Sequence, residues 1–167
     1  MATHLRPLVR VGAAALLLLF VLSGVPAPVR AQASGGDIAV IAHPGVTVDN
    51  LSLADLRRIL LGDREFWPSG ERITLLLRAP VARERDAAVR EVCQMSEAQF
   101  RQHWIGKVFR AETPTGPKIV YSSQMAIDQV TRTPGAITFV EASDVPKNAR
   151  TIRIDGRAPG QPGYRLR

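Results

Sequence analysis

The sequence predicts an α/β protein: a three-layer single domain built around a mixed, mostly parallel sheet. Short apolar runs with strand character alternate with segments of helical periodicity, as expected of strands joined by crossover helices. The run Ile73–Leu77 is apolar almost throughout, which is typical of a strand buried on both faces. Residues 34–167 supply 134 positions, enough for one domain with a single hydrophobic core.

Residues 1–33 have the composition of an export signal. Two arginines precede the apolar run Val11–Val25, which is 15 residues long and too short for a comfortable membrane span. Cleavage after Ala31 or after Ala33 satisfies the preference for small residues at such sites. We therefore expect a periplasmic protein whose signal is removed; an uncleaved N-terminal anchor is the alternative.

The first predicted strand is Ile38–Ala42, and a helix follows between Ser52 and Gly62. Ser52 is a favourable N-cap residue, and Asp55 suits the first helical turn, where the helix dipole favours acidic side chains. Gly62 ends the helix because glycine readily adopts the left-handed conformation after the last turn. The loop Asp63–Gly70 carries two large aromatic residues, which we expect to cap the core.

The chain is organised around the strand–turn–helix segment Arg72–Cys93. Ala79-Pro80 ends the strand, since proline cannot donate to a sheet ladder, and Arg83–Cys93 has helical composition. A helix that begins behind a buried strand directs its free N–H groups toward the carboxyl edge of the sheet, where α/β proteins bind anions. Three arginines crowd this turn: Arg78, Arg83 and Arg85.

Five further elements are predicted in the second half of the chain. Ser96 and Gln99 have the spacing of a capping box at the start of a helix, Glu97–Phe109. Ser122 and Ser123 open another helix. The remaining elements are short strands: Ile119–Tyr121, Ala136–Val140 and Thr151–Ile154.

The sequence contains no recognisable catalytic or metal-binding motif. Cys93 is the only cysteine, so it cannot form an internal disulfide. We expect it to be buried and to pack as a small apolar residue. His43 and His103 lie sixty residues apart without metal-ligand spacing, and no P-loop, nucleophile elbow or dinucleotide motif occurs. We expect a protein that is not an enzyme and that uses no cofactor and no metal.

The chain is basic, with 22 Lys and Arg residues against 15 Asp and Glu. Removal of the signal leaves 19 basic side chains against the same 15 acidic ones, which is a modest excess. Six of these basic residues lie in the Pro/Gly-rich segment 146–167, which we expect to form a solvated, loosely ordered edge. Nucleic acid is not an expected partner, because the protein is exported and no aromatic-rich face accompanies these charges.

Three motifs in series resemble the substrate-binding proteins of phosphate ABC importers. The first is Leu53–Gly62 followed by Trp67-Pro68-Ser69-Gly70, and the second is Thr133–Val140, with Thr138 and Phe139 in place of the family's Gly-Tyr. The third combines Ile154–Pro159 with Tyr164-Arg165-Leu166. The resemblance implies a fold like one lobe of a type II periplasmic binding protein, over residues 34–167. The family needs about twice this length to close two lobes on its anion.

The resemblance also assigns roles at the central turn. Arg78 matches the family arginine that pairs with phosphate, whereas Ala82, Arg83 and Glu84 replace the family's Ser-Gly-Thr. Two hydroxyl donors are lost, which at about 1.5–3 kcal/mol each corresponds to roughly two to four decades of affinity. The anion-binding residues implied are, in order, Arg78, Arg83, Arg85, Ser122 and Ser123.

Two functional hypotheses remain open at this point. In the first, the chain is a solute-binding-protein-like domain that binds phosphate or another oxyanion weakly, in association with ABC-type import. In the second, it is a ligand-free interaction module derived from such a lobe. Its partner would then be an ABC permease, an envelope sensor or a second copy of the chain. An exported hydrolase is a third hypothesis, which no nucleophile–base pair in the sequence supports.

Overall fold

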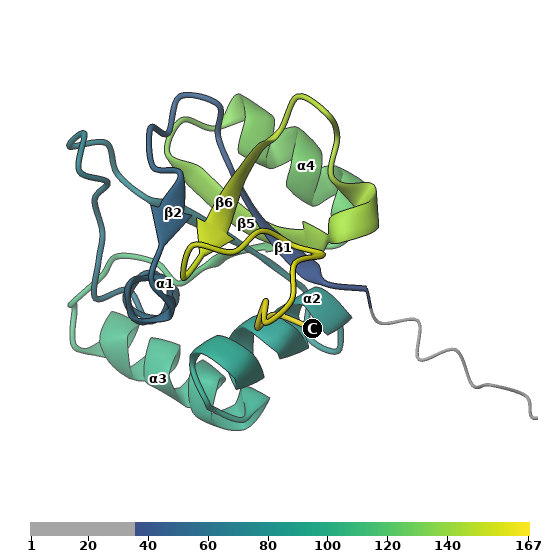
Figure 1. Ribbon diagram of the computed structural model, residues 1–167. Coiled ribbons are helices and arrows are strands. Elements are labelled where there is room, and N and C mark those ends of the chain that lie inside the picture. Colours follow the sequence, from purple (N-terminus) through teal and green to yellow (C-terminus); the bar gives the residue numbers. More distant parts are fainter. Residues whose placement is uncertain (1–35) are drawn as a thin grey trace, which may run out of the picture. The chain divides into compact units, whose positions relative to one another are not determined.

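Six strands form one sheet in the part of the chain that the structure, a computed structural model, describes, residues 36–167. The order of the strands is β2-β6-β1-β5-β3-β4. Figure 1 labels four of them, β1, β2, β5 and β6. Their bounds are β1 Ile38–Ala42, β2 Asn50–Leu51, β3 Thr74–Arg78, β4 Lys118–Val120, β5 Ala136–Glu141 and β6 Arg150–Ile154. The expected export signal, residues 1–33, lies outside the described residues.

The sheet is mixed and mostly parallel, as the sequence predicts. Strand β3 runs parallel to both β4 and β5, and β2 runs parallel to β6. Strand β1 is antiparallel to both of its neighbours, β5 and β6. Because β3 and β4 are parallel neighbours, their carboxyl ends meet at the same edge of the sheet.

Helices cover both faces of the sheet, which confirms the three-layer α/β prediction (Figure 1). Helix α4 covers one face, and α1, α2 and α3 cover the other. The residues of β1 are all buried and alternate between two core clusters, one on each face. The helices are α1 Leu53–Leu60, α2 Arg83–Ala87, α3 Glu97–Phe109 and α4 Ser123–Arg132, with a short 3₁₀ turn, η2, at Ala142–Asp144.

The predicted helix starts are confirmed by their capping bonds. The side chain of Ser52 accepts a hydrogen bond from the N–H of Asp55 at the start of α1. Ser96 and Gln99 form a reciprocal capping box at the start of α3. Ser122 caps α4, so the helix begins at Ser123.

The prediction of one continuous α-helix over 83–93 is wrong in its second half. The segment is α-helical only to Ala87 and continues as a π-helical turn, η1, over Ala88–Val92. The extra residue in a π turn changes the direction of the following side chains. Here Val89, Val92 and Cys93 are all buried in the cluster that includes α1. Strand β2 is too short to carry a sequence pattern and was not predicted.

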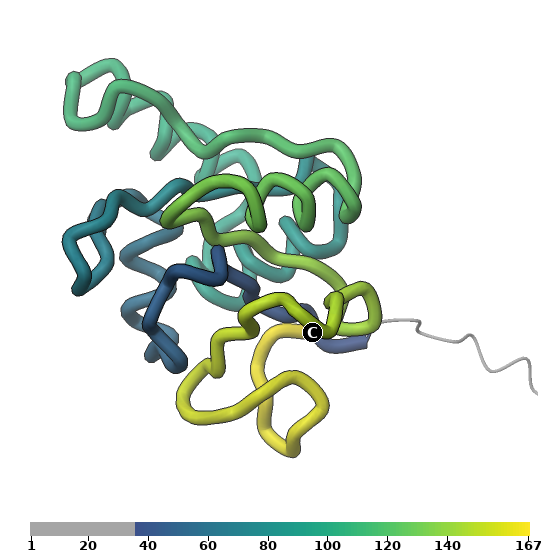
Figure 2. Tube along the Cα trace, turned by 90° about the horizontal axis from the view of Figure 1, so that it is seen from above, coloured from purple at the N-terminus to yellow at the C-terminus, as the bar shows by residue number. Residues whose placement is uncertain are grey.

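The prediction of a loosely ordered C-terminal segment is also wrong. Tyr164 and Leu166 are buried in the core, and the segment is tied to β1 by two hydrogen bonds. The N–H of Ile38 donates to the oxygen of Leu166 at 2.9 Å, and the hydroxyl of Tyr164 donates to the oxygen of Ile38 at 2.7 Å. Figures 1 and 2 show the C-terminus beside the first described strand. The prediction was based on the six basic residues of the segment and did not take account of the two apolar residues that anchor it.

The loop after α1 is closed by a hydrogen bond between two of the resembling motifs. Trp67 is buried, and its indole N–H donates to the backbone oxygen of Gly135 at 2.9 Å. The prediction that an aromatic residue of this loop caps the core is confirmed for Trp67, whereas Phe66 is exposed. The first and second motifs, which are separate in the sequence, are therefore in direct contact in the fold.

We expect Gly135→Ala to destabilise the fold strongly. Gly135 has a φ of +69°, and a Cβ added there would lie 2.1 Å from the backbone oxygen of Arg72. The backbone strain costs about 1–3 kcal/mol, and the steric overlap adds to it. Gly156→Ala is the matched control, because Gly156 also has a positive φ but faces open space. Denaturant unfolding should show a clearly larger loss for Gly135→Ala; equal losses would contradict the steric argument.

Candidate functional site

The candidate site is the turn that joins β3 to α2, beside the start of α4. Arg78 is the last residue of β3 and is paired in register with Val120 at the end of β4. Only Tyr121 and the cap residue Ser122 separate β4 from α4. The parallel pairing of β3 and β4 therefore brings the turn 79–82 next to the first turn of α4.

Arg78, Ser123 and Glu84 form a closed triangle of hydrogen bonds. The Nη1 atom of Arg78 donates to Ser123 Oγ at 2.7 Å and to Glu84 Oε1 at 3.1 Å. The hydroxyl of Ser123 in turn donates to Glu84 Oε1 at 3.0 Å. Glu84 is only 5% exposed. A carboxylate of the chain itself thus accepts the hydrogen bonds that both the arginine and the serine direct at it.

Arg85 contacts the backbone of Arg78, and its guanidinium is engaged by other groups of the protein. It forms a two-pronged ion pair with Glu97, through Nε at 2.9 Å and Nη2 at 2.8 Å. Its Nη1 atom donates to the backbone oxygen of Arg78 at 3.1 Å, which fixes the end of β3. The guanidinium also lies 5.5 Å from the centre of the Phe100 ring, within the range of a cation–π contact.

Arg83 points away from the triangle. Its Nη1 atom lies 2.5 Å from both carboxylate oxygens of Glu141 at the end of β5, and its Nη2 atom donates to the oxygen of Gly36. Ser122 is also engaged elsewhere, because its side chain caps α4 by accepting from the N–H of Met125. Of the five residues expected to bind an anion, the structure brings Arg78 and Ser123 together. Arg85 contacts only the backbone oxygen of Arg78 among them.

The electrostatic balance of the turn is close to neutral. All three arginines form ion pairs with carboxylates of the described chain, at Glu84, Glu141 and Glu97. One donor is left over, because the Nε atom of Arg78 is buried without a hydrogen-bond partner in the described residues. The sequence identified the basic residues of this turn, but it gave no sign that each one would be matched by an acid.

The turn also contains a backbone conformation that side chains other than glycine rarely adopt. Val81 has a φ of +69° and is fully exposed. A left-handed conformation at a β-branched residue is a genuine outlier. Helix α2 has no side-chain cap, since Ala82 stands at its N-cap position. These features accompany the loss of the Ser-Gly-Thr sequence that the resembling family has here.

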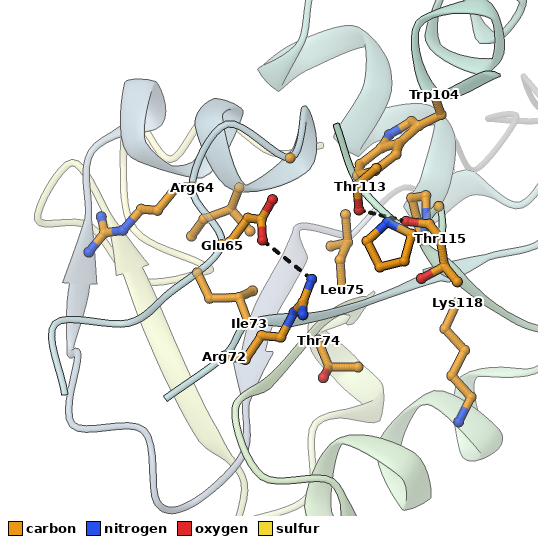
Figure 3. A pocket seen from close by; sticks show the side chains of 15 residues that line it. Arg64, Glu65, Arg72, Ile73, Thr74, Leu75, Trp104, Thr113, Thr115 and Lys118 are labelled. Carbon is orange, nitrogen blue, oxygen red and sulfur yellow. Dashed lines mark hydrogen bonds and ion pairs between the residues drawn. The ribbon is translucent and has the colours of Figure 1, made fainter. Parts of the chain in front are cut away.

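A second hollow lies at the opposite, amino end of β3 and was not predicted. It is a cavity of about 640 Å³ between the loop 63–72, the start of β3 and the segment 113–118 (Figure 3). Its two arginines are paired, Arg72 with Glu65 and Arg64 with Asp55. Trp104 closes one side, and its indole N–H donates to the oxygen of Leu60 at 3.2 Å. No sequence motif marks this cavity, because its walls come from four separate segments.

Other chemistry-bearing residues have structural partners. His103 Nε2 lies 2.9 Å from the oxygen of Leu61, and Lys107 donates to the oxygen of Gly62 and to Asp63. Within residues 36–167 no group of His, Cys, Asp and Glu is arranged to hold a metal ion. In the same range, no helix has both the length and the apolar character needed to cross a membrane.

We expect Cys93 to be inert in the folded protein. Burial raises the pKa of its thiol from 9.0 to about 12, although Arg57 acts in the opposite direction. The unfolded thiol ionises near 9.0 while the folded thiol stays protonated, so this group's contribution to stability is lost as the pH rises from 9.0 toward 12. At pH 8, Ellman's reagent should label the native chain far more slowly than the denatured chain. Comparable rates would contradict the burial of this residue.

Solved structures with a similar fold are phosphate-transport proteins. A phosphate ABC transporter substrate-binding protein from Clostridium perfringens, with bound phosphate, is 20% identical, with a TM-score of 0.60 over 74% of this chain and 47% of that one. An ABC-type phosphate transport receptor from Vibrio cholerae is 17% identical, with a TM-score of 0.60 over 74% and 48%. PstS from Borrelia burgdorferi is 14% identical, with a TM-score of 0.59 over 74% and 49%.

The chain shares the fold of these transport proteins. It spans about half the length of each of them, which fits the prediction of a single lobe. The sequence matches no family model and no curated protein. The resemblance inferred from three short motifs is therefore confirmed at the level of the fold. Two of these structural relatives are described as a substrate-binding protein and a transport receptor.

Proposed function

We propose that this chain is an exported binding-protein-like domain that acts by contacting a partner protein, with its ancestral anion site closed by its own Glu84. The observation that carries the proposal is the triangle of Arg78, Ser123 and Glu84. The export part of the proposal rests on residues 1–33, whose sequence has the features of a cleavable signal.

The argument against tight phosphate capture is electrostatic. A phosphate at Arg78 would have to displace the carboxylate of Glu84 or lie beside it. Two like charges 4 Å apart repel by about 4 kcal/mol at an effective dielectric constant of 20, equivalent to roughly three decades of affinity. The carboxylate also has the advantage of being part of the chain, because it loses no translational freedom when it pairs with Arg78.

The resemblance to importer binding proteins suggests the partner class that we propose. Binding-protein-like domains of importers meet a permease, and an envelope sensor or a second copy of the chain is an alternative partner. Inorganic phosphate, as a weak ligand, belongs to the second candidate function and not to this one. We propose no nucleic-acid partner, cofactor or metal for this domain.

Weak oxyanion binding at the same turn is the second candidate function. Two observations favour it: the Clostridium perfringens protein holds phosphate, and the Nε atom of Arg78 has no partner in the described residues. In this case Glu84 would act as a displaceable substitute for the ligand, and binding would require it to leave the triangle.

Isothermal titration of the wild-type chain with phosphate, and separately with sulfate, distinguishes the two functions. The first proposal expects no saturable heat up to millimolar anion. Saturable binding of phosphate at or below millimolar concentration, lost in an Arg78→Ala chain that circular dichroism shows to be folded, would overturn it in favour of the second. The exposed pair of Arg90 and Asp86 offers a control, since Arg90→Ala removes a cation far from any proposed ligand contact.

A further inference from the structure

Exposed apolar side chains gather around one edge of the sheet. Seven large apolar residues are exposed in the described part of the chain, and three of them, Ile105, Val108 and Phe109, line one groove with Ile119 of β4. Phe109 is 90% exposed, and Tyr121, which follows β4 directly, is 73% exposed. Contiguous exposed apolar surface on a small domain marks an interaction site.

Ile105, Val108 and Phe109 line a groove between α3 and β4. The groove has a volume of about 450 Å³ and an apolar lining from both elements. Phe100 forms its floor as a fully buried residue, and Ile119 of β4 faces it from the sheet. The other apolar lining residues are Trp104 and Pro117.

The strand beside the groove has an unpaired edge. Among the residues that the structure describes, β4 is the last strand of the sheet and pairs with β3 alone. The N–H of Ala79 donates to the oxygen of Val120, so the backbone of Val120 faces β3. Since backbone groups alternate in direction along a parallel strand, Ile119 directs its N–H and C=O away from the sheet. An unpaired edge of this kind accepts an added strand.

The charges around the groove are positive. Arg101 lines the groove, whereas Lys118 begins β4 and, by strand alternation, has its side chain on the face opposite to Ile119; both are exposed and form no ion pair within residues 36–167. The nearby carboxylates are already matched, Glu97 by Arg85 and Glu112 by Arg110. A two-fold pairing with a second copy would place the same cations opposite one another, which disfavours self-association here. The complementary occupant is acidic.

We propose that this surface, the groove with the outer edge of β4, binds an extended segment of a partner protein in which apolar residues alternate with acidic ones. The segment adds to β4 as a further strand, and its apolar side chains enter the groove. Strand alternation places its acids on the opposite face, the face of Lys118, while Arg101 at the groove adds to the attraction for an acidic segment. The inference rests on the proposed function as an interaction module and names the chemistry of the partner segment. It does not involve the triangle at Arg78.

Fluorescence polarisation with synthetic probes tests this proposal on the wild-type chain. The probe is a labelled eight-residue peptide in which Asp alternates with Val and Phe; the comparison peptide has Lys in place of every Asp. We expect the acidic peptide to bind at least tenfold more tightly than the basic one. N-methylation of alternate backbone nitrogens, which prevents strand pairing, should weaken it by a similar factor. Equal binding of the acidic and basic peptides, or an unchanged affinity after methylation, would overturn the proposal.

A matched pair of double variants checks the location of binding. Arg101→Glu with Lys118→Glu should weaken the acidic peptide at least tenfold, whereas Lys147→Glu with Arg165→Glu changes the net charge equally and should have no effect. Equal weakening by both would show non-specific attraction and contradict the site. A concentration-dependent mass abolished by Phe109→Ser would instead assign the surface to a second copy of the chain. None of these readouts depends on phosphate, so this test and the phosphate titration can fail separately.

Discussion

Glu84→Thr is expected to create phosphate binding in a chain that otherwise lacks it. The substitution removes the carboxylate that pairs with Arg78 and restores one hydroxyl at the position where the resembling family has threonine. It also leaves Arg78 and Ser123 with unsatisfied donors directed at the vacated position. One charge-assisted hydrogen bond contributes about 1.5–3 kcal/mol, so at least a tenfold gain in affinity should follow from the hydroxyl alone.

Isothermal titration with phosphate measures this gain. Glu91→Thr is the matched control, because it removes the same charge seven residues further along, in the π-helical turn η1, where Glu91 pairs with Arg90. The control should behave like the wild-type chain. The triple variant Ala82→Ser, Arg83→Gly, Glu84→Thr restores the complete family sequence and should bind more tightly than Glu84→Thr. If Glu84→Thr and wild type bind phosphate equally, the carboxylate does not close the site.

Arg78→Ala is expected to cost about 3–5 kcal/mol of stability, because it leaves the buried carboxylate of Glu84 without its cation. The side chains of Arg78 and Glu84 are only 16% and 7% exposed, so water cannot replace the lost partner fully. Urea unfolding, followed by circular dichroism, gives the difference. Arg90→Ala is the control, since its partner Asp86 is well exposed, and a surface pair contributes at most about 1 kcal/mol.

Replacing both members of the buried pair separates the two possible causes of the loss. In the double variant Arg78→Met, Glu84→Met no uncompensated charge remains, and most of the stability lost in Arg78→Ala should return. A double variant as unstable as Arg78→Ala would show that packing around the β3–α2 turn, and not the unpaired carboxylate, sets the stability there.

Most of the fold could be predicted because its signals are local. Helix α3 begins and ends where the capping box and the apolar spacing place it, and Ser52 and Ser122 mark the starts of α1 and α4. These signals act within four residues along the chain, so a sequence contains them in full. The apolar runs likewise identified β1, β3 and β5, which are buried on both faces.

The errors in the fold come from contacts between distant residues. The C-terminal segment is anchored by Tyr164 and Leu166 against β1, more than 120 positions earlier in the chain. The π-helical turn at Ala88–Val92 depends on how the helix packs in the core, and its composition is that of an ordinary α-helix. Local patterns contain no information about such pairings.

For the candidate site, the sequence by itself determined the turn, its arginines and the replacement of Ser-Gly-Thr by Ala82-Arg83-Glu84. Only the tertiary structure decided that Glu84 folds back onto Arg78 and Ser123, and that Arg83 and Arg85 are taken by Glu141 and Glu97. The reason is physical: an ion pair depends on the distance between two side chains, and the partners of Arg83 and Arg85 stand 58 and 12 positions away in the sequence. The charge of the turn can be read from its residues, but its neutralisation requires the fold.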